Sequence, residues 1–171
     1  MNYSIRRTLR RLWSPQHELA CDMFVWRRLL RGLRERGAGH RESGAFLLGS
    51  IDDTARVISD FVLYDDIDPH ALDKGFVQLN GASMGKLWAY CRQRNLQVVA
   101  DVHTHPGGPE QSESDQLNPM ISVIGHISLI VPNYAQGEVR RGSLGLYRYL
   151  GGRQWHTVVN TDRVNFFYVG I

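Results

Sequence analysis

Several features that would assign the chain to a special class of protein are absent from its sequence. The 171 residues include only two cysteines, Cys21 and Cys91. They lie far apart in the sequence, each in an expected helix, and in a reducing compartment we expect both to be free, buried thiols. No apolar run approaches the roughly 18 residues of a membrane span, and the basic N-terminus lacks the apolar stretch of a signal peptide. We therefore expect a cytoplasmic protein with no membrane partner.

Internal repeats and low-complexity segments are also absent, which excludes repeat architectures. The composition, 43% hydrophobic and 22% charged, is ordinary for a globular protein. A chain of this length is long enough to bury one sizeable core. We therefore expect residues 1–171 to form a single domain.

The excess of positive charge is small, with a formal net charge of +3. Many arginines lie near the start of the chain and could attract nucleic acid or an acidic protein. The alternative is that these arginines form the solvated faces of one strand and one helix. We favour that alternative, so nucleic acid is not an expected partner.

The most informative stretch is 98–116, VVADVHTHPGGPEQSESDQ. Residues 96–102 are rich in apolar and β-branched side chains, which predicts a buried strand that ends before Pro106. Successive side chains on a strand point to opposite faces. His103 and His105 are therefore expected on one face, close enough to bind one ion.

Two polar residues follow the turn after this strand. Ser112 is typical of a helix N-cap, and Asp115 would then lie in the first helical turn. From there its carboxylate can point back at His103 and His105. Two imidazoles and a carboxylate suit zinc, and three protein ligands leave a fourth position for water. The alternatives are a chance His-x-His spacing and a purely structural cap, since motif matches carry false positives.

The order His103-Thr104-His105-Pro106, followed by Ser112-x-x-Asp115, resembles the metal motif of the JAMM (MPN-plus, or JAB) zinc metalloproteases. This family also uses an upstream glutamate, and the context of Glu42 in RESGAFLLG matches it. The resemblance implies that His103, His105 and Asp115 bind one Zn²⁺ per chain. It implies that Glu42 is the general base and that Ser112 helps to hold the oxyanion. The spacing between His105 and Ser112 is one residue shorter than usual, which we interpret as a shortened turn.

The resemblance also implies a substrate. Family members cleave after the C-terminal glycine of ubiquitin or a ubiquitin-like protein, and this compact chain resembles bacterial members, some of which act in anti-phage operons. The expected partners are a ubiquitin-like protein or its conjugates, with E1-like and E2-like proteins of the same operon as further partners. The alternatives are a peptidase that trims a sulfur-carrier protein, a non-catalytic binding module and a DNA-binding protein.

The apolar pattern predicts an α/β fold with a mixed central β-sheet flanked by helices, which is the outline of the JAB/MPN fold. Residues 3–13 fit a basic amphipathic helix or an edge strand, and the resemblance favours the strand. A helix over 15–36 is expected to follow, with Ser14 as its N-cap and Pro15 at its first position. The other expected elements are a hairpin over 43–50 and 55–64, a helix over 80–94, a short helix with Asp115 in its first turn, a strand over 126–131, a hairpin over 142–150 and 154–160, and an apolar tail over 164–171 that either forms a strand or contacts a partner.

Four further assignments depend on local context. Glu42 alone would be interpreted as an exposed charge at a strand end, and His126 as a core residue with a local hydrogen bond. Met120, Ile121 and Ile124 are expected to cover the sheet. The acidic segment, with Asp65, Asp66, Asp68 and His70, could form a second metal cluster, but we favour a solvated loop.

Overall fold

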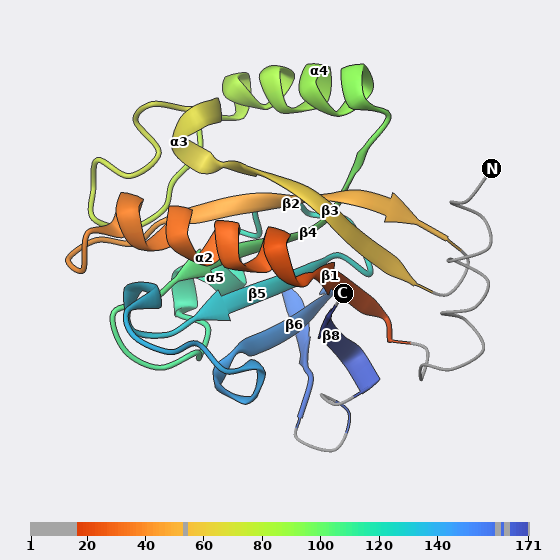
Figure 1. The fold of residues 1–171 in the computed structure, drawn as a ribbon. Helices are drawn as coiled ribbons and strands as arrows, with labels where there is room; N and C mark the ends of the chain where they lie inside the picture. The colour runs from red at the N-terminus through yellow and green to blue at the C-terminus, as the bar shows by residue number, and fades with distance from the viewer. Residues whose placement is uncertain (1–16, 53–54, 160–161, 163–164, 171) are drawn as a thin grey trace.

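The computed structural model describes residues 17–52, 55–159, 162 and 165–170. The expected strand over 3–13 and the Ser14-Pro15 cap lie outside the described residues. The described part is a mixed α/β fold with an eight-stranded sheet (Figure 1). Its strands and main helices are β1 (Leu19–Asp22), α2 (Met23–Gly37), β2 (Gly44–Ile51), β3 (Arg56–Leu63), α3 (Tyr64–Ile67), α4 (Met84–Arg94), β4 (Gln97–Thr104), α5 (Glu113–Leu117), β5 (Ile127–Val131), β6 (Gly145–Gly151), β7 (Gln154–Thr157) and β8 (Phe167–Gly170).

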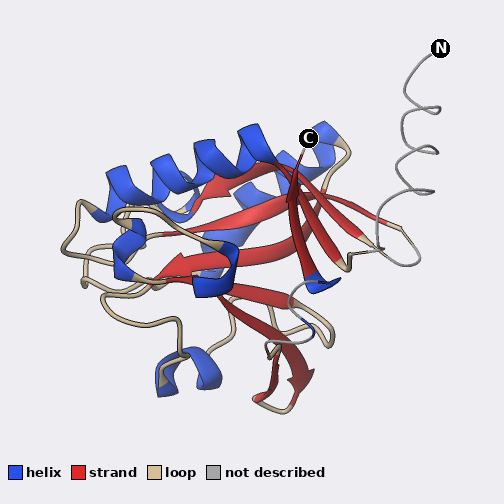
Figure 2. Ribbon diagram, turned by 60° about the horizontal axis from the view of Figure 1, so that its bottom comes forward, coloured by secondary structure: helices blue, strands red, loops and turns tan. Residues whose placement is uncertain are grey.

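The strands follow the order β7-β6-β5-β4-β2-β3-β1-β8 across the sheet. The pairs β4–β5, β1–β3 and β1–β8 are parallel, and the remaining pairs are antiparallel. The sheet curls, as the fan of strands in Figure 2 shows. The expected mixed sheet and both expected hairpins are therefore confirmed.

The two faces of the sheet bury two separate groups of apolar side chains. In β2, Ala45 and Leu47 belong to the cluster that includes α2, whereas Phe46 and Leu48 belong to the cluster that includes α4. This alternation is the period of two that a strand imposes on its side chains. In Figure 1, α2 crosses in front of the sheet and α4 lies above it.

Two glycines of β2 allow close approaches that a larger residue would block. A Cβ atom on Gly44 would lie 2.2 Å from Cε2 of Tyr64, and one on Gly49 would lie 1.7 Å from the carbonyl oxygen of Val57. At Gly49 the register with β3 shifts, as at a β-bulge. At Gly44 the missing side chain leaves room for the ring of Tyr64.

The predicted start of the first long helix was wrong. Leu19 and Cys21 lie in β1, which pairs with β3 and β8, and the helix begins only at Met23. The carboxylate of Asp22 accepts hydrogen bonds from the amides of Phe24 (2.8 Å) and Val25 (3.3 Å), which is the arrangement of an N-cap. The apolar spacing continues from strand into helix, so periodicity alone could not separate them.

Both cysteines are free and buried, as expected. Cys91 lies on α4 as predicted, but Cys21 lies on a strand. Burial raises the pKa of the Cys21 thiol to about 12, so this thiol is a poor nucleophile. The tail forms β8. Ile124 is 74% exposed and does not cover the sheet, whereas Met120 and Ile121 pack against the cluster that includes α4.

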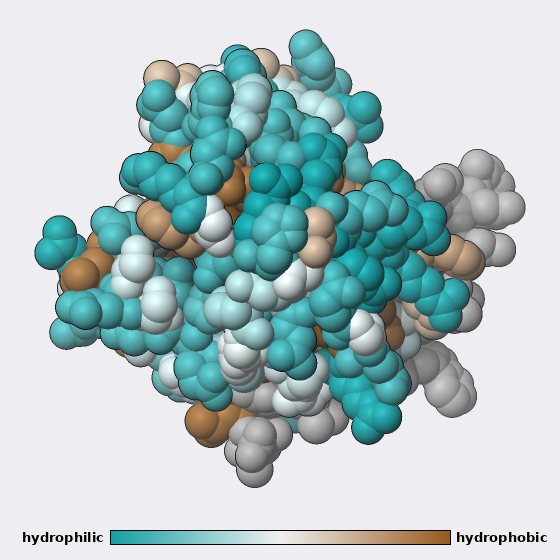
Figure 3. Space-filling view, turned by 90° about the vertical axis from the view of Figure 1, so that its left-hand side faces the viewer, coloured by the Kyte–Doolittle hydropathy of each residue, from teal (hydrophilic) through white to brown (hydrophobic). Residues whose placement is uncertain are grey.

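Within the described residues, no helix has both the length and the apolar character needed to cross a membrane. Several long loops gather on the left-hand side of the molecule in Figure 1. Seen from that side, the surface is mostly hydrophilic, with a few small hydrophobic patches (Figure 3).

Candidate metal centre

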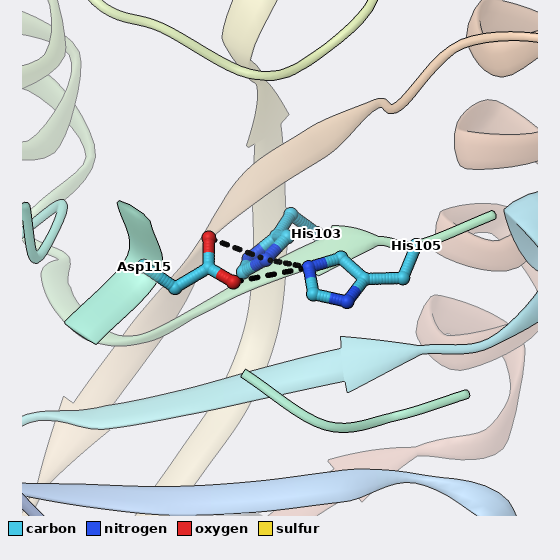
Figure 4. Close-up of side chains that lie close together, drawn as sticks. All are labelled: His103, His105 and Asp115. Carbon is cyan, nitrogen blue, oxygen red and sulfur yellow. Dashed lines mark hydrogen bonds and ion pairs between the residues drawn. The ribbon is translucent and has the colours of Figure 1, made fainter. Parts of the chain in front are cut away.

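Two buried histidines lie at the end of β4, in the middle of the sheet. His103 pairs in register with Gly44 of β2 and Ile130 of β5. His105 lies just beyond the strand, where its amide donates a hydrogen bond to the carbonyl oxygen of Val131 (3.0 Å). The Nε2 atoms of the two histidines are 3.0 Å apart. The strand periodicity thus brings the two imidazoles together as the sequence predicted (Figure 4).

The third side chain comes from the first turn of α5. Ser112 is the N-cap, and its hydroxyl oxygen accepts a hydrogen bond from the amide of Asp115 (3.2 Å). The Asp115 carboxylate accepts hydrogen bonds from the Ser112 amide (2.7 Å) and hydroxyl (2.8 Å) at Oδ2. This reciprocal pair is a capping box with aspartate in the usual place of glutamate. It holds the carboxylate toward the two histidines, as predicted.

The three side chains converge on one point. Asp115 Oδ1 lies 3.3 Å from Nε2 of His103, and Asp115 Oδ2 lies 3.1 Å from Nε2 of His105. A tetrahedral zinc with Zn–N and Zn–O distances of about 2.0–2.1 Å would space its ligand atoms about 3.3–3.4 Å apart. The observed separations are close to these values, so the residues fit a single metal ion. Among the described residues, this is the only group of three or more such side chains that could hold one.

Within the cluster of His103, His105 and Asp115, the carboxylate and the imidazoles stabilise each other's charged forms. Burial lowers the pKa of His103, but the hydrogen bond and charge of Asp115, with the charges of Asp101 and Glu42, outweigh burial and leave this pKa raised. For Asp115, burial raises the pKa, but hydrogen bonds from both imidazoles outweigh it and hold the pKa well below its usual range. The carboxylate therefore stays ionised beside the histidines.

Glu42 lies two residues before the start of β2 and borders the cluster. Its Oε1 is 4.0 Å from Nε2 of His105. Its Oε2 accepts a hydrogen bond from the amide of Val77 (3.3 Å), and its own amide donates to the carbonyl oxygen of Gly75 (2.9 Å). Burial raises the pKa of Glu42 more than the nearby imidazoles lower it. Glu42 is thus not a fully exposed strand-end charge, and the loop before α4 holds it in place.

The acidic segment forms no metal cluster among the described residues. Asp65 and Asp66 lie on α3 and both pair with the guanidinium of Arg36. Asp68 caps a turn by accepting a hydrogen bond from the amide of His70 (3.1 Å). These carboxylates are held by separate partners instead of converging, so the second metal site is not supported.

A strained turn lies directly beside His105. Three consecutive residues, Asn133, Tyr134 and Ala135, have positive φ angles of 52°, 50° and 58°. This conformation costs about 1–2 kcal/mol per non-glycine residue. The amide of Tyr134 donates a hydrogen bond to the carbonyl oxygen of His105 (2.8 Å), and the amide of Asn133 donates to that of Gly107 (3.1 Å). The turn therefore anchors the segment that carries His105.

Sequence reasoning missed two features of the surroundings. One is the left-handed conformation of this turn: Pro132-Asn133 indicates the end of a strand, and asparagine tolerates positive φ, but Tyr134 and Ala135 give no such signal. The other is Asp101, which is 1% exposed. Asp101 precedes His103 by two residues and so shares its face of β4. This spacing, together with an aspartate inside an apolar strand, was the available signal.

Comparisons with known proteins agree with this picture. No protein-family model matches the sequence. Among curated proteins, the chain is similar to "Probable metalloprotease y4jG" of Sinorhizobium fredii, with 27% identity over 126 residues, or 74% of this chain and 78% of that protein. Among solved structures, it is similar to protein DSY2949 from Desulfitobacterium hafniense, with a TM-score of 0.62 and 12% identity over 88% of this chain and 92% of that one. At that identity the structural similarity shows the fold alone.

Proposed function

We propose that this chain is a zinc-dependent metallopeptidase of the JAMM type, with a JAB/MPN-like fold. It hydrolyses the amide or isopeptide bond after the C-terminal glycine of a ubiquitin-like protein. The observation that carries the proposal is the convergence of His103, His105 and Asp115, with Glu42 4.0 Å from His105. The similarity to a probable metalloprotease supports peptidase activity in general.

The metal would be held by Nε2 of His103, Nε2 of His105 and one oxygen of Asp115. A bound zinc ion supplies Lewis acidity, which makes water a stronger nucleophile and polarises a carbonyl group. Three protein ligands leave the fourth position of a tetrahedral ion accessible, which separates catalytic from structural zinc sites. The protein supplies the rigid frame, because two ligands come from one strand end and the third from a capped helix.

Glu42 is the proposed general base. Its carboxylate borders the two imidazoles without belonging to the converging trio, so it is free to accept a proton from the attacking water. Its pKa is raised, chiefly by burial, and a base is most effective when its pKa lies nearer the working pH. The protonated Glu42 then donates this proton to the leaving amine.

Ser112 is the proposed donor to the oxyanion. In the structure its hydroxyl donates to Asp115 Oδ2, so this role requires the hydroxyl to rotate toward the substrate. Its side chain is exposed at the rim of the site, which leaves room for that rotation. Such a donor typically contributes about 3–4 kcal/mol to transition-state stabilisation.

The test uses two substrates made from a ubiquitin-like protein: one with a peptide fused after the C-terminal glycine, and one joined through the ε-amino group of a lysine. Each is incubated with zinc-loaded protein, and intact masses are measured. We expect cleavage directly after the glycine, loss of activity with a chelator, and recovery on addition of zinc. Cleavage that persists in the chelated protein would overturn the proposal.

The role of Glu42 is tested by Glu42→Gln. We expect the rate to fall roughly 10²–10⁴-fold while one zinc per chain is retained, because a base is removed and no ligand is lost. Glu35→Gln is the matched control, since Glu35 is an exposed carboxylate on α2. Loss of zinc from Glu42→Gln, or an unchanged rate, would contradict this assignment.

A further inference from the structure

The third proposed ligand, Asp115, lies on a segment that buries little of its own surface. We call residues 106–118, which include α5, the ligand loop. Asp115 is partly buried, and the other four residues of α5 are exposed. The turn described above holds the start of the ligand loop, at Gly107. The capping box with Ser112 orients the carboxylate on α5, so α5 itself must be fixed against β4 by other contacts.

The first of these contacts joins the ligand loop to β6. The carbonyl oxygen of Pro109 accepts a hydrogen bond from the hydroxyl of Tyr147 (2.7 Å). A Cβ atom on Gly145 would lie 2.1 Å from the same carbonyl oxygen, so a larger residue at this position would push the loop away. Gly145 and Tyr147 are two residues apart and share one face of β6. The ligand loop therefore lies directly on β6 at Pro109.

The second contact joins the ligand loop to β7, next to Asp115. The last carbonyl groups of a helix have no partner within that helix. In α5, the carbonyl oxygen of Gln116 accepts a hydrogen bond from Nε1 of Trp155 (3.2 Å). Trp155 pairs with Tyr149 of β6, and their rings pack with centroids 4.9 Å apart. The end of α5 is thus held by an aromatic pair on the hairpin of β6 and β7.

The register of the sheet relates these two contacts to the histidines. His103 pairs with Ile130 of β5, and Ile130 pairs with Gly145 of β6. Paired residues of neighbouring strands share one face, and the strands lie about 4.8 Å apart. Gly145 therefore lies in the same cross-strand row as His103, roughly 10 Å away. Because one hydrogen-bonded sheet connects them, a loop fixed on the hairpin is also fixed relative to His103.

We propose that Tyr147 and Trp155 are positioning residues, which hold the ligand loop on the sheet and so keep Asp115 directed at the two histidines before the metal binds. This inference rests on the proposed function. It deepens that function because it assigns part of the zinc affinity to two residues that do not contact the ion. A ligand that is already in place does not have to be ordered when the metal binds, which favours binding.

The experiment measures the Zn²⁺ affinity of the full chain by competition with a chromophoric chelator. We expect Tyr147→Phe and Trp155→Phe each to weaken zinc binding about 3–10-fold, the factor that corresponds to one net hydrogen bond, and the double variant to bind more weakly than either. Two variants on α4 are the matched controls. Tyr90→Phe loses a hydrogen bond to Asp60 (3.0 Å), and Trp88→Phe replaces a tryptophan that is 40% exposed. We expect both controls to bind zinc as the wild type does.

The same variants in an Asp115→Asn background separate positioning from a general effect on the fold. If Tyr147 and Trp155 act through Asp115, their replacement should cause no further loss of zinc affinity in that background, because no carboxylate is left to position. An equal loss in both backgrounds would overturn the positioning role. If the wild type binds no zinc, the proposed function fails. If the wild type binds zinc and the variants bind it equally well, only the positioning role fails.

A second measurement covers the case in which Asp115→Asn binds zinc too weakly for competition. NMR relaxation gives the backbone order parameters of Asp115 and Gln116 in the metal-free protein. We expect these values to fall in the double variant of Tyr147 and Trp155, to recover when zinc is added, and to stay unchanged in the two α4 controls. Unchanged order parameters in the double variant, or an equal fall along β4, would contradict the inference.

Discussion

The molecule contains two neighbouring groups of buried histidine and aspartate, and they differ in how completely their polar atoms are paired. In one group, which we call the Asp101 cluster, the buried carboxylate of Asp101 has three close partners: Tyr64 on α3, Ser128 on β5 and His126 just before β5. In the metal-site cluster of His103, His105 and Asp115, two imidazole nitrogens face one another at 3.0 Å, and His103 Nδ1 has no partner among the described residues. β4 contributes Asp101 to one group and His103 to the other. We call the fully paired Asp101 cluster the closed group, and the incompletely paired metal-site cluster the open group.

The difference indicates what each group contributes. Buried polar groups are normally hydrogen-bonded, because an unpaired one costs free energy. A fully paired network rigidifies the fold, whereas an incompletely paired one is retained where a ligand completes it. The strained turn at Asn133, Tyr134 and Ala135 lies beside the open group, and backbone strain also concentrates at functional sites. We therefore infer that the closed group stabilises the fold and that the open group depends on its ligand.

The largest expected effect on folding follows from opening the closed group. His126→Ala should destabilise the metal-free protein by about 3–5 kcal/mol, because it leaves the buried carboxylate of Asp101 without its closest partner. His105→Ala removes a buried histidine from the open group and should cost the metal-free protein about 1 kcal/mol. Urea unfolding in the presence of a chelator measures both free energies.

With zinc present, the order of the two free energies of unfolding should reverse, so that His126→Ala becomes the more stable variant. Zinc stabilises a protein whose native state binds it, in proportion to its affinity. His105→Ala lacks a ligand and should gain little from zinc, whereas His126→Ala retains all three ligands and should gain more. Equal losses of stability in the metal-free state would show that the two groups do not differ as inferred.

The next prediction concerns the pH dependence of the metal-free protein. The folded-state pKa of Asp115 is lowered, so its contribution to stability is present above the unfolded value of about 3.9 and is lost as the pH falls. The folded-state pKa of His103 is raised, so its contribution is present below the unfolded value of about 6.5 and is lost as the pH rises through the folded value. The pair should stabilise most between these limits.

Urea unfolding from acidic to neutral pH, with chelator, tests this window. Asp115→Asn should flatten the profile, because it removes the charge on which both shifts depend. Zinc should move the optimum to higher pH, since a ligating imidazole must be deprotonated. An unchanged profile in Asp115→Asn would show that the open group carries no ion pair in the absence of metal.

The sequence predicted the open group and missed the closed one for a physical reason. His103 and His105 share a face because of strand periodicity, and Asp115 is placed by the capping box with Ser112; both are local effects. The partners of Asp101 come from β5 and from the start of α3, so only the folded sheet brings them together. The strand β1 was missed for the same reason, since its partners β3 and β8 are distant in the chain.

The position of Glu42 falls between these cases. Its place before β2 could be predicted from the apolar pattern, and its distance from His105 follows from the antiparallel pairing of β2 with β4. The loop that holds its carboxylate could not be predicted, because the amide of Val77 reaches Glu42 through an irregular segment. Catalytic roles based on the resemblance therefore remain predictions until the variants are measured.

The smallest expected effect on stability is at Ala38, a residue outside both groups. A variant at this position serves as a reference for the variants within them. Ala38 ends α2 in the left-handed conformation, with φ of 49°, and is exposed. Ala38→Gly should stabilise the protein by about 0.5–1 kcal/mol, because glycine removes the left-handed strain but adds backbone entropy to the unfolded chain. Zinc affinity should not change, since this strain serves no ligand. If Ala38→Gly also altered zinc binding, the open group would extend beyond its three side chains, and the contrast between the two groups would have to be redrawn.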